Sequence, residues 1–187
     1  MTEDARFPGL LEHIEQRLGP VQRVESAKTA AGNRGYDLTF YENDQPPVTT
    51  VVTNGLRFQA ITSMLPEEIM CSLRSDQQHI AMYLVDSMAS LILKNKQGME
   101  YGSVFENSKP LIEGTKITAL VGHTNLIHDV GFNLFPGHDA PKLQLITMVP
   151  ITGYEVDFIK EEGPDMLFEV FRDNRTNILD VQRESAV

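Results

Sequence analysis

The stretch "KLQLITMVPIT", residues 142–152, decides the fold, because it places apolar side chains on both alternating faces of an extended chain. Successive side chains of a strand point to opposite faces of a sheet, so this run predicts a central strand that is buried on both sides. Pro150 is expected to close the strand, since proline cannot donate to a neighbouring strand. The sequence therefore predicts a sheet that is covered on both faces.

A helix is expected directly after this strand. Thr152 and Glu155 have the spacing of a capping box, in which each side chain bonds the backbone amide of the other residue. Ile151 and Val156 are placed for a hydrophobic staple, which fixes the entry of the chain into the helix. Gly163-Pro164 then interrupts the helical pattern. A second short helix follows, indicated by Met166, Leu167, Val170 and Phe171.

Three further strands are expected between residues 67 and 135. Residues 116–122 and 130–135 are β-prone runs that flank a turn, and residues 67–75 form another such run. The last of these carries Cys71, the chain's single cysteine, in mid-strand. A small apolar side chain at such a position is more often a packing residue than a nucleophile.

The longest predicted helix follows residues 67–75. Ser75 and Gln78 have the spacing of a second capping box, and an apolar stripe at helical spacing runs from Ile80 to Ile92. Gly98 is expected to end this helix. Residues 98–114 are rich in Gly, Asn, Ser and Pro, which indicates a loop with one edge strand rather than a linker between domains.

The first third of the chain also predicts sheet and helix. Residues 8–18 have apolar positions at helical spacing, and a helix there should cover the sheet. Residues 35–42 alternate apolar and polar side chains, as a strand does. Residues 47–61 contain two β-prone runs around Asn54-Gly55, a pair that favours a tight hairpin turn. Together these elements predict one α+β domain over residues 1–187, with a mixed, largely antiparallel sheet packed with helices.

Composition restricts the classes of partner. The chain has 187 residues and a net charge of −10, so it would repel a phosphate backbone, and nucleic acid is not expected as a partner. No apolar run approaches the length of a membrane span, and the acidic start "MTEDARFPG" does not resemble a secretory signal. A cytoplasmic protein without membrane contact is therefore expected. The acidity would favour a basic protein partner.

Histidines 123, 128 and 138, with Asp129 and Asp139, form the only sequence cluster rich in metal-ligating residue types. Their spacing does not match a known metal motif, and the chain has no GxSxG, CxxC, HExxH or phosphate-binding glycine loop. Solvated turn residues are the simpler interpretation. A metal-dependent hydrolase that uses these histidines is therefore kept as an alternative only, and no catalytic residue, metal or cofactor is assigned.

Phe132, Leu134 and Phe135 precede the turn at Pro136-Gly137. If this segment is a strand that reaches the surface, one or two of these side chains should line a groove for a partner. The alternative is that they belong to the core, as aromatic residues near a strand end usually do.

Three blocks of the chain resemble the suppressor of fused family: "TVVTNGL" at residues 50–56, "EIMCSL" at residues 68–73 and "KLQLITMVPIT" at residues 142–152. The closing "ILDVQRES" is also similar to the end of that family. The likeness extends over residues 34–187. It implies a single suppressor of fused domain of the bacterial type.

The resemblance implies a non-enzymatic module that binds a protein or an extended peptide. Larger animal relatives sequester transcription factors by adding a short peptide to a sheet, and bacterial single-domain relatives are often immunity proteins against toxins. An immunity protein that neutralises a basic toxin domain is the nearer analogue for a chain of this length. Asp129, Phe132, Phe135 and His138 lie in the family's variable stretch and are the predicted partner-binding residues. A housekeeping interaction scaffold remains open as another role.

Overall fold

The computed structural model describes residues 6–187. At Val130 it describes the backbone but not the side chain. A mixed, mostly antiparallel sheet runs in the order β1-β4-β5-β6-β10-β8-β7, and β9 also pairs with β10. Among the described strands of this sheet, only β6 and β10 are parallel neighbours. Its strands are β1 (Arg23–Glu25), β4 (Asp37–Asp44), β5 (Pro47–Asn54), β6 (Glu67–Arg74), β7 (Val104–Glu106), β8 (Ile117–His123), β9 (Leu134–Phe135) and β10 (Leu143–Thr152).

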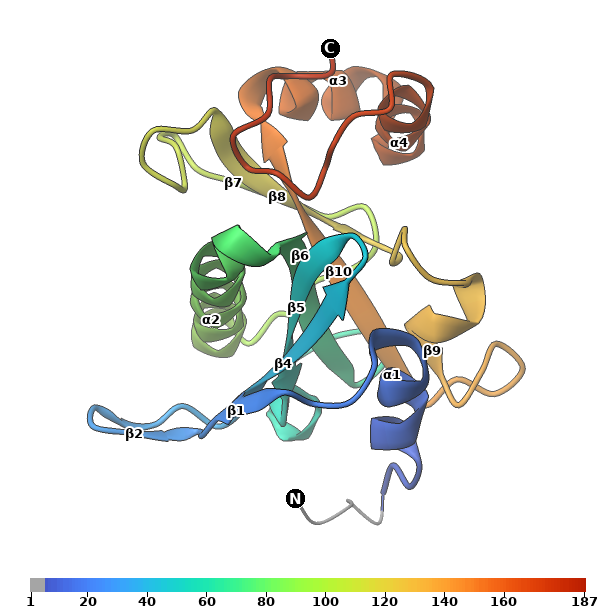
Figure 1. The fold of residues 1–187 in the computed structure, drawn as a ribbon. Coiled ribbons are helices and arrows are strands. Elements are labelled where there is room, and N and C mark those ends of the chain that lie inside the picture. Colours follow the sequence, from blue (N-terminus) through green and yellow to red (C-terminus); the bar gives the residue numbers. More distant parts are fainter. Residues whose placement is uncertain (1–5) are drawn as a thin grey trace.

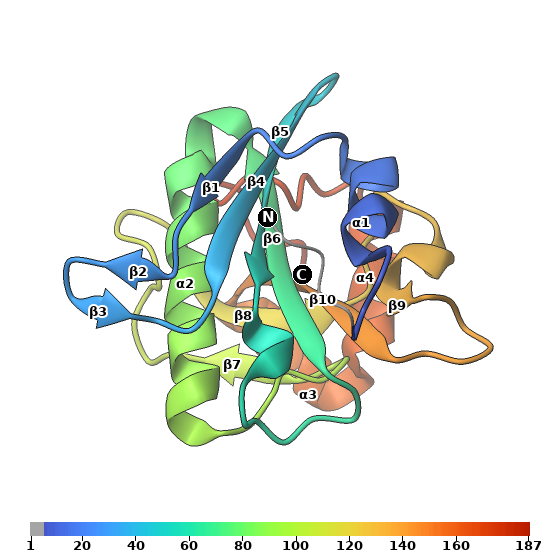
Figure 2. The same cartoon turned by 90° about the horizontal axis from the view of Figure 1, so that it is seen from below.

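Helices cover both faces of the sheet. Helix α2 lies on one face and α1 on the other, while α3 and α4 cover the end of β10 (Figures 1 and 2). The remaining elements are short, and β2 and β3 form a separate two-stranded hairpin. The bounds are α1 (Leu10–Leu18), α2 (Gln78–Asn95), α3 (Gly153–Glu162), α4 (Pro164–Asp173), η1 (Leu56–Phe58), η2 (Ser75–Gln77), η3 (Val130–Asn133), β2 (Lys28–Thr29) and β3 (Gly32–Asn33).

Strand β10 is the centre of the fold, and all ten of its residues are buried. Its side chains enter three hydrophobic clusters because successive residues face opposite sides of the sheet. They are Leu143 and Leu145 beneath α1, Ile146 and Met148 beneath α2, and Val149 and Ile151 beneath α3 and α4. The predicted central strand, covered on both faces, is confirmed.

Pro150 does not close β10, contrary to the prediction, because the strand continues to Thr152. Pro150 pairs with Leu120 of β8, and its carbonyl accepts a hydrogen bond from Nη2 of Arg183 at 3.0 Å. The N–H and C=O groups of one strand residue point to the same side of the strand. Because the carbonyl of Pro150 points to Arg183 and not to β8, its nitrogen, which has no hydrogen, also points away from β8. On that side β10 pairs with β6 only as far as Thr147. Pro150 therefore occupies an unpaired position, where proline is tolerated.

One of the two predicted capping boxes is present. The hydroxyl of Thr152 accepts from the N–H of Glu155, and Oε2 of Glu155 accepts from the N–H of Thr152 at 2.8 Å. The box predicted at Ser75 and Gln78 is wrong. Ser75 begins the 3-10 helix η2, and α2 starts at Gln78 without a side-chain cap.

Gly98 does not end α2, which stops at Asn95 with Lys96 in the left-handed region at φ 54°. A different contact explains why a glycine is needed at position 98. A Cβ at Gly98 would lie 2.7 Å from the carboxylate of Glu67, so only glycine permits the close approach of this buried acid.

The predicted hairpin at Asn54-Gly55 is also wrong. The described chain turns instead between β4 and β5, at residues 44–47, and η1 follows β5. Gly55 adopts φ 128° and donates its N–H to Oε1 of Glu68 at 2.8 Å. A contact with a residue far along the chain therefore fixes this turn, and the local pattern could not reveal it.

Residues 130–135 form η3 and the two-residue strand β9 rather than one strand. The side chain of Asp129 accepts from the N–H of Gly131 at 2.9 Å and caps η3. Such a local bond competes with strand pairing. None of the described helices is long and apolar enough to cross a lipid bilayer.

Candidate functional site

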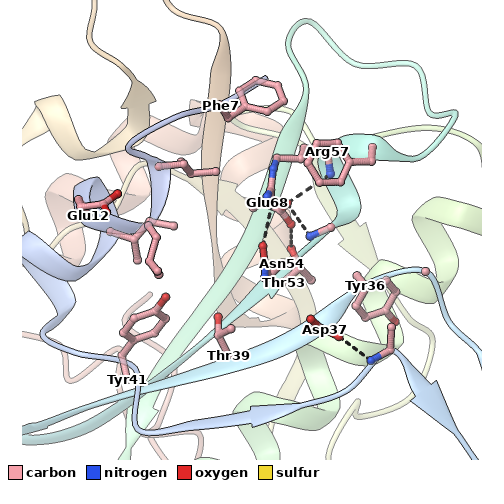
Figure 3. Close-up of a pocket in the computed structure, with 17 residues that line it drawn as sticks. Phe7, Glu12, Tyr36, Asp37, Thr39, Tyr41, Thr53, Asn54, Arg57 and Glu68 are labelled. Carbon is pink, nitrogen blue, oxygen red and sulfur yellow. Dashed lines mark hydrogen bonds and ion pairs between the residues drawn. The ribbon is translucent and has the colours of Figure 1, made fainter. Parts of the chain in front are cut away.

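A cleft of about 660 Å³ lies between α1 and the sheet face formed by β4, β5 and β6 (Figure 3). This volume is typical of pockets that hold a ligand or the anchor side chains of a partner. Its walls come from parts of the chain that are far apart in sequence. The lining residues are Phe7, Leu10, Leu11, Glu12, Ile14, Ala27, Gly35, Tyr36, Asp37, Thr39, Tyr41, Thr53, Asn54, Gly55, Arg57, Phe58 and Glu68.

The α1 wall of the cleft is apolar. Leu10 and Ile14 are four residues apart, so they share one face of the helix and are buried against the sheet. Leu11 follows Leu10 on α1, and Phe7 lies just before the helix. Both side chains line the cleft and are half-buried. Leu11 and Phe7 therefore present apolar surface that the described residues, 6–187, do not fully cover.

The sheet wall is polar because β4 turns alternate side chains toward α1. Leu38 and Phe40 enter the cluster beneath α2, whereas Asp37, Thr39 and Tyr41 line the cleft. Tyr41 is only 2% exposed, and burial raises the pKa of its hydroxyl to about 12. This phenol therefore remains neutral at physiological pH and is able to donate a hydrogen bond.

Glu68 is a fully buried carboxylate at the base of the cleft. Five donors surround it: the guanidinium of Arg57, the hydroxyl of Thr53 at 2.6 Å, and the N–H groups of Gly55, Leu56 and Arg57. Burial raises the pKa of Glu68, and the charge of Arg57 and these hydrogen bonds oppose that shift. Its acceptor capacity is used within the chain, so Glu68 fixes the turn after β5.

Arg57 closes one end of the cleft between two aromatic rings. Its guanidinium carbon lies 4.2 Å from the ring centre of Phe58 and 5.8 Å from that of Phe7. The buried Nε of Arg57 has no hydrogen-bond acceptor among the described residues. Contact of a guanidinium with aromatic faces offsets part of this cost. Together with the Glu68 ion pair, these rings leave little of the positive charge of Arg57 for a ligand.

The structure separates the four predicted partner-binding residues from this cleft. Phe132 is 0% exposed and Phe135 is 7% exposed, and both pack beneath α1. The prediction that they line an open groove is wrong, because η3 and β9 turn them into the core. Asp129 and His138 are exposed, Asp129 forms an ion pair with Arg17 at 3.4 Å, and that contact lowers the pKa of Asp129. None of the four lines the cleft.

The histidine cluster of the sequence is not assembled in space. The rings of His123 and Phe168 stack with their centres 3.6 Å apart. Nε2 of His123 lies 3.1 Å from the hydroxyl of Tyr101. His128 packs edge-on against Phe132 at 5.3 Å. Burial lowers the pKa of both histidines. The described part of the chain contains no group of three or more His, Cys, Asp or Glu side chains that could hold a metal ion.

Sequence reasoning missed the cleft, although one signal pointed to it. The alternation in residues 35–42 correctly separates Asp37, Thr39 and Tyr41 from the apolar side chains of β4. A polar strand face is usually assigned to solvent. Only the packing of α1 across this face converts it into the wall of a cleft.

One comparison with known proteins identifies a family for this chain. The family described as Suppressor of fused protein (SUFU) matches residues 32–184. Among curated proteins, no sequence matched. A solved SUFU homolog from Neisseria gonorrhoeae has a TM-score of 0.71 at 14% identity, and the alignment covers 95% of this chain and 94% of that one.

Two further solved structures share the fold. A chain of the Sufu-Fu complex has a TM-score of 0.68 at 14% identity, with 95% of this chain and 91% of that chain covered. Drosophila Suppressor of Fused has a TM-score of 0.68 at 14% identity, with 99% of this chain but 54% of that one covered. The match over residues 32–184 places this chain in the suppressor of fused family.

Proposed function

We propose that this chain is a non-enzymatic binding module that captures an extended segment of another protein through the cleft beside α1. The observation that carries the proposal is the shape and chemistry of that cleft. It combines half-buried apolar side chains on one wall with hydroxyls and a carboxylate on the other. Such a mixed surface suits a peptide, whose backbone needs hydrogen bonds and whose side chains need apolar contacts.

The family supports a protein partner. One solved structure with this fold is a chain of a complex between Sufu and Fu. The net charge of −10 would also speed the approach of a basic partner, by steering that salt weakens. We propose that the partner is a basic toxin domain and that this chain acts in the cytoplasm as its immunity protein. A tight complex of this kind would bury roughly 1,600 Å² in total.

Asp129 and His138 remain candidate contacts at the edge of such an interface. Both are exposed, and Asp129 lies beside Arg17 near the end of α1. A partner that fills the cleft and continues along α1 would reach this region.

The test is capture from native extract with two immobilised forms of the chain, the wild type and Leu11→Arg. The arginine would replace apolar surface of the cleft wall with a long charged side chain that occupies the space and the carboxylates meant for the partner. We expect one basic protein to be retained by the wild type and lost with Leu11→Arg, and a toxin-like gene to lie next to the gene of this chain. Retention of the same components of a host complex by both forms would instead favour a housekeeping scaffold.

A further inference from the structure

The charges that line the cleft do not cancel. Arg57 and Glu68 form an ion pair within the wall, so they contribute no net charge to the cavity. Glu12 and Asp37 also line it, and neither forms an ion pair with any residue in the described range 6–187. The cavity therefore carries two carboxylates that lack a cationic partner within the described chain.

The two carboxylates lie on opposite walls. Glu12 projects from α1 near the mouth, and Asp37 lies on β4, with the side chains of Thr39 and Tyr41 between them (Figure 3). Oδ1 of Asp37 accepts the N–H of Ala27 at 2.7 Å, which holds the carboxylate in place. Its Oδ2 makes no hydrogen bond with a described residue and is available to a ligand.

The apolar side chains of α1 lie opposite Asp37 and beside Glu12. Leu11 and Phe7 present half-buried side chains above the buried Leu10 and Ile14. Long basic side chains bury their methylene stems on apolar surface while the charged end meets a carboxylate. A wall of this kind opposite an acid therefore matches arginine or lysine better than it matches a purely apolar side chain.

An anionic ligand fits poorly. The cationic side chain that lines the cleft, Arg57, is neutralised by Glu68 and covered by two aromatic rings. An incoming carboxylate or phosphate would meet Glu12 and Asp37, and the described residues that line the cleft supply no further cation to balance them. The net charge of the whole chain, −10, acts in the same direction.

We infer that the cleft receives a long basic side chain, arginine or lysine, from the captured segment. The stem lies along Leu11 and Phe7, the charged group binds Asp37, and Glu12 attracts it at the mouth. This inference rests on the proposed function, because it names the anchor residue of the partner. It also defines a partner class: a basic protein with at least one exposed arginine or lysine in an extended segment.

The test uses two small probes and nuclear magnetic resonance of the full, isotope-labelled chain. N-acetylarginine amide carries the cation, and N-acetylcitrulline amide has nearly the same shape without charge. We expect the arginine probe to shift amide resonances of residues 10–14 and 37–41 in a saturable way. Loss of one charge-assisted hydrogen bond should make the citrulline probe about tenfold weaker.

Two variants locate the effect. Asp37→Asn keeps an oxygen for the N–H of Ala27 and should weaken the arginine probe about tenfold, with an otherwise unchanged spectrum. Asp173→Asn on α4, whose aspartate side chain is 77% exposed and remote from the cleft, is the matched control and should leave binding unchanged. Equal affinity for both probes, or unchanged arginine binding by Asp37→Asn, would overturn the inference.

The outcome separates this inference from the proposed function. Specific binding of the arginine probe supports the basic-group site even if no protein partner is captured, in which case the binding-module proposal fails alone. Capture of a protein partner that is unaffected by Asp37→Asn would remove the inference and leave the binding module intact.

Discussion

Arg183 and Glu155 form a bidentate ion pair that is buried in the protein. The two contacts measure 2.5 and 2.7 Å, and the side chains are 6% and 0% exposed. Glu155 belongs to the capping box of α3, and Arg183 also donates to the carbonyl of Pro150. The pair thus ties the C-terminal segment to the start of α3 and to the central strand.

Removal of one partner should therefore destabilise the fold. Arg183→Met would leave the charge of Glu155 buried without compensation, and we expect a loss of about 3–5 kcal/mol in the free energy of unfolding. Urea denaturation monitored by circular dichroism measures it. Arg172→Met is the control, because its side chain is 72% exposed and its ion pairs lie at the surface, and it should change stability by less than about 1 kcal/mol. Equal effects of the two variants would contradict a structural role for the buried pair.

Phe132 should behave as a core residue. Phe132→Ala is expected to cost about 3–5 kcal/mol of stability, because it removes a ring that is 0% exposed beneath α1. Thermal unfolding of the variant measures the loss. Tyr154→Ala on α3, where the side chain is 74% exposed, should leave the midpoint nearly unchanged. A Phe132→Ala variant with wild-type stability but weaker partner capture would restore the groove interpretation.

Glu67 should make stability depend on pH. This carboxyl is fully buried beside Met99 and Gln144, and burial raises its pKa from 4.5 to about 7. The folded state holds this proton more tightly than the unfolded state, so the contribution is fully present below pH 4.5. It is lost as pH rises through about 7. As pH rises from 4.5 through 7, we expect the free energy of unfolding of Glu67→Gln to increase relative to that of the wild type, by up to about 3 kcal/mol.

The measurement for Glu67 is urea denaturation of both forms at several pH values between 4.5 and 8. The difference between the two forms isolates Glu67, since other titrating groups are common to both. A difference that does not change with pH would show that Glu67 is not protonated in the folded protein near neutrality.

Cys71 should be inert in the folded protein. It is fully buried in β6, and burial raises the pKa of its thiol to about 12. Because the thiolate is the reactive form, an aromatic disulfide reagent should label Cys71 only after denaturation. Rapid labelling of the native chain at pH 8 would contradict this packing role, which the sequence already indicated from the mid-strand position.

Local patterns were sufficient for the elements whose stabilising contacts are local. The alternation in β10 and the Thr152 and Glu155 box involve neighbours in sequence, and both are present as predicted. The turn at Gly55 and the close approach at Gly98 depend on Glu68 and Glu67, which are 13 and 31 positions away by sequence number. No local rule contains such contacts, so the predictions made there failed.

The cleft could not be predicted for a similar reason. The side chains of Asp37, Thr39 and Tyr41 were placed on one strand face, but the wall opposite them comes from α1. The sequence indicated α1 as a cover for the sheet without indicating which part it covers. The aromatic residues chosen instead, Phe132 and Phe135, are those that anchor α1 to the sheet.

The cleft beside α1 is the proposed binding site for the partner. Calorimetric titration of the captured protein into the wild type and into Leu11→Arg tests it most directly, with Tyr154→Arg on the exposed face of α3 as the control. We expect one binding site per chain for the wild type and the control, and an affinity about thirtyfold or more lower for Leu11→Arg. Equal affinities for all three forms would contradict it.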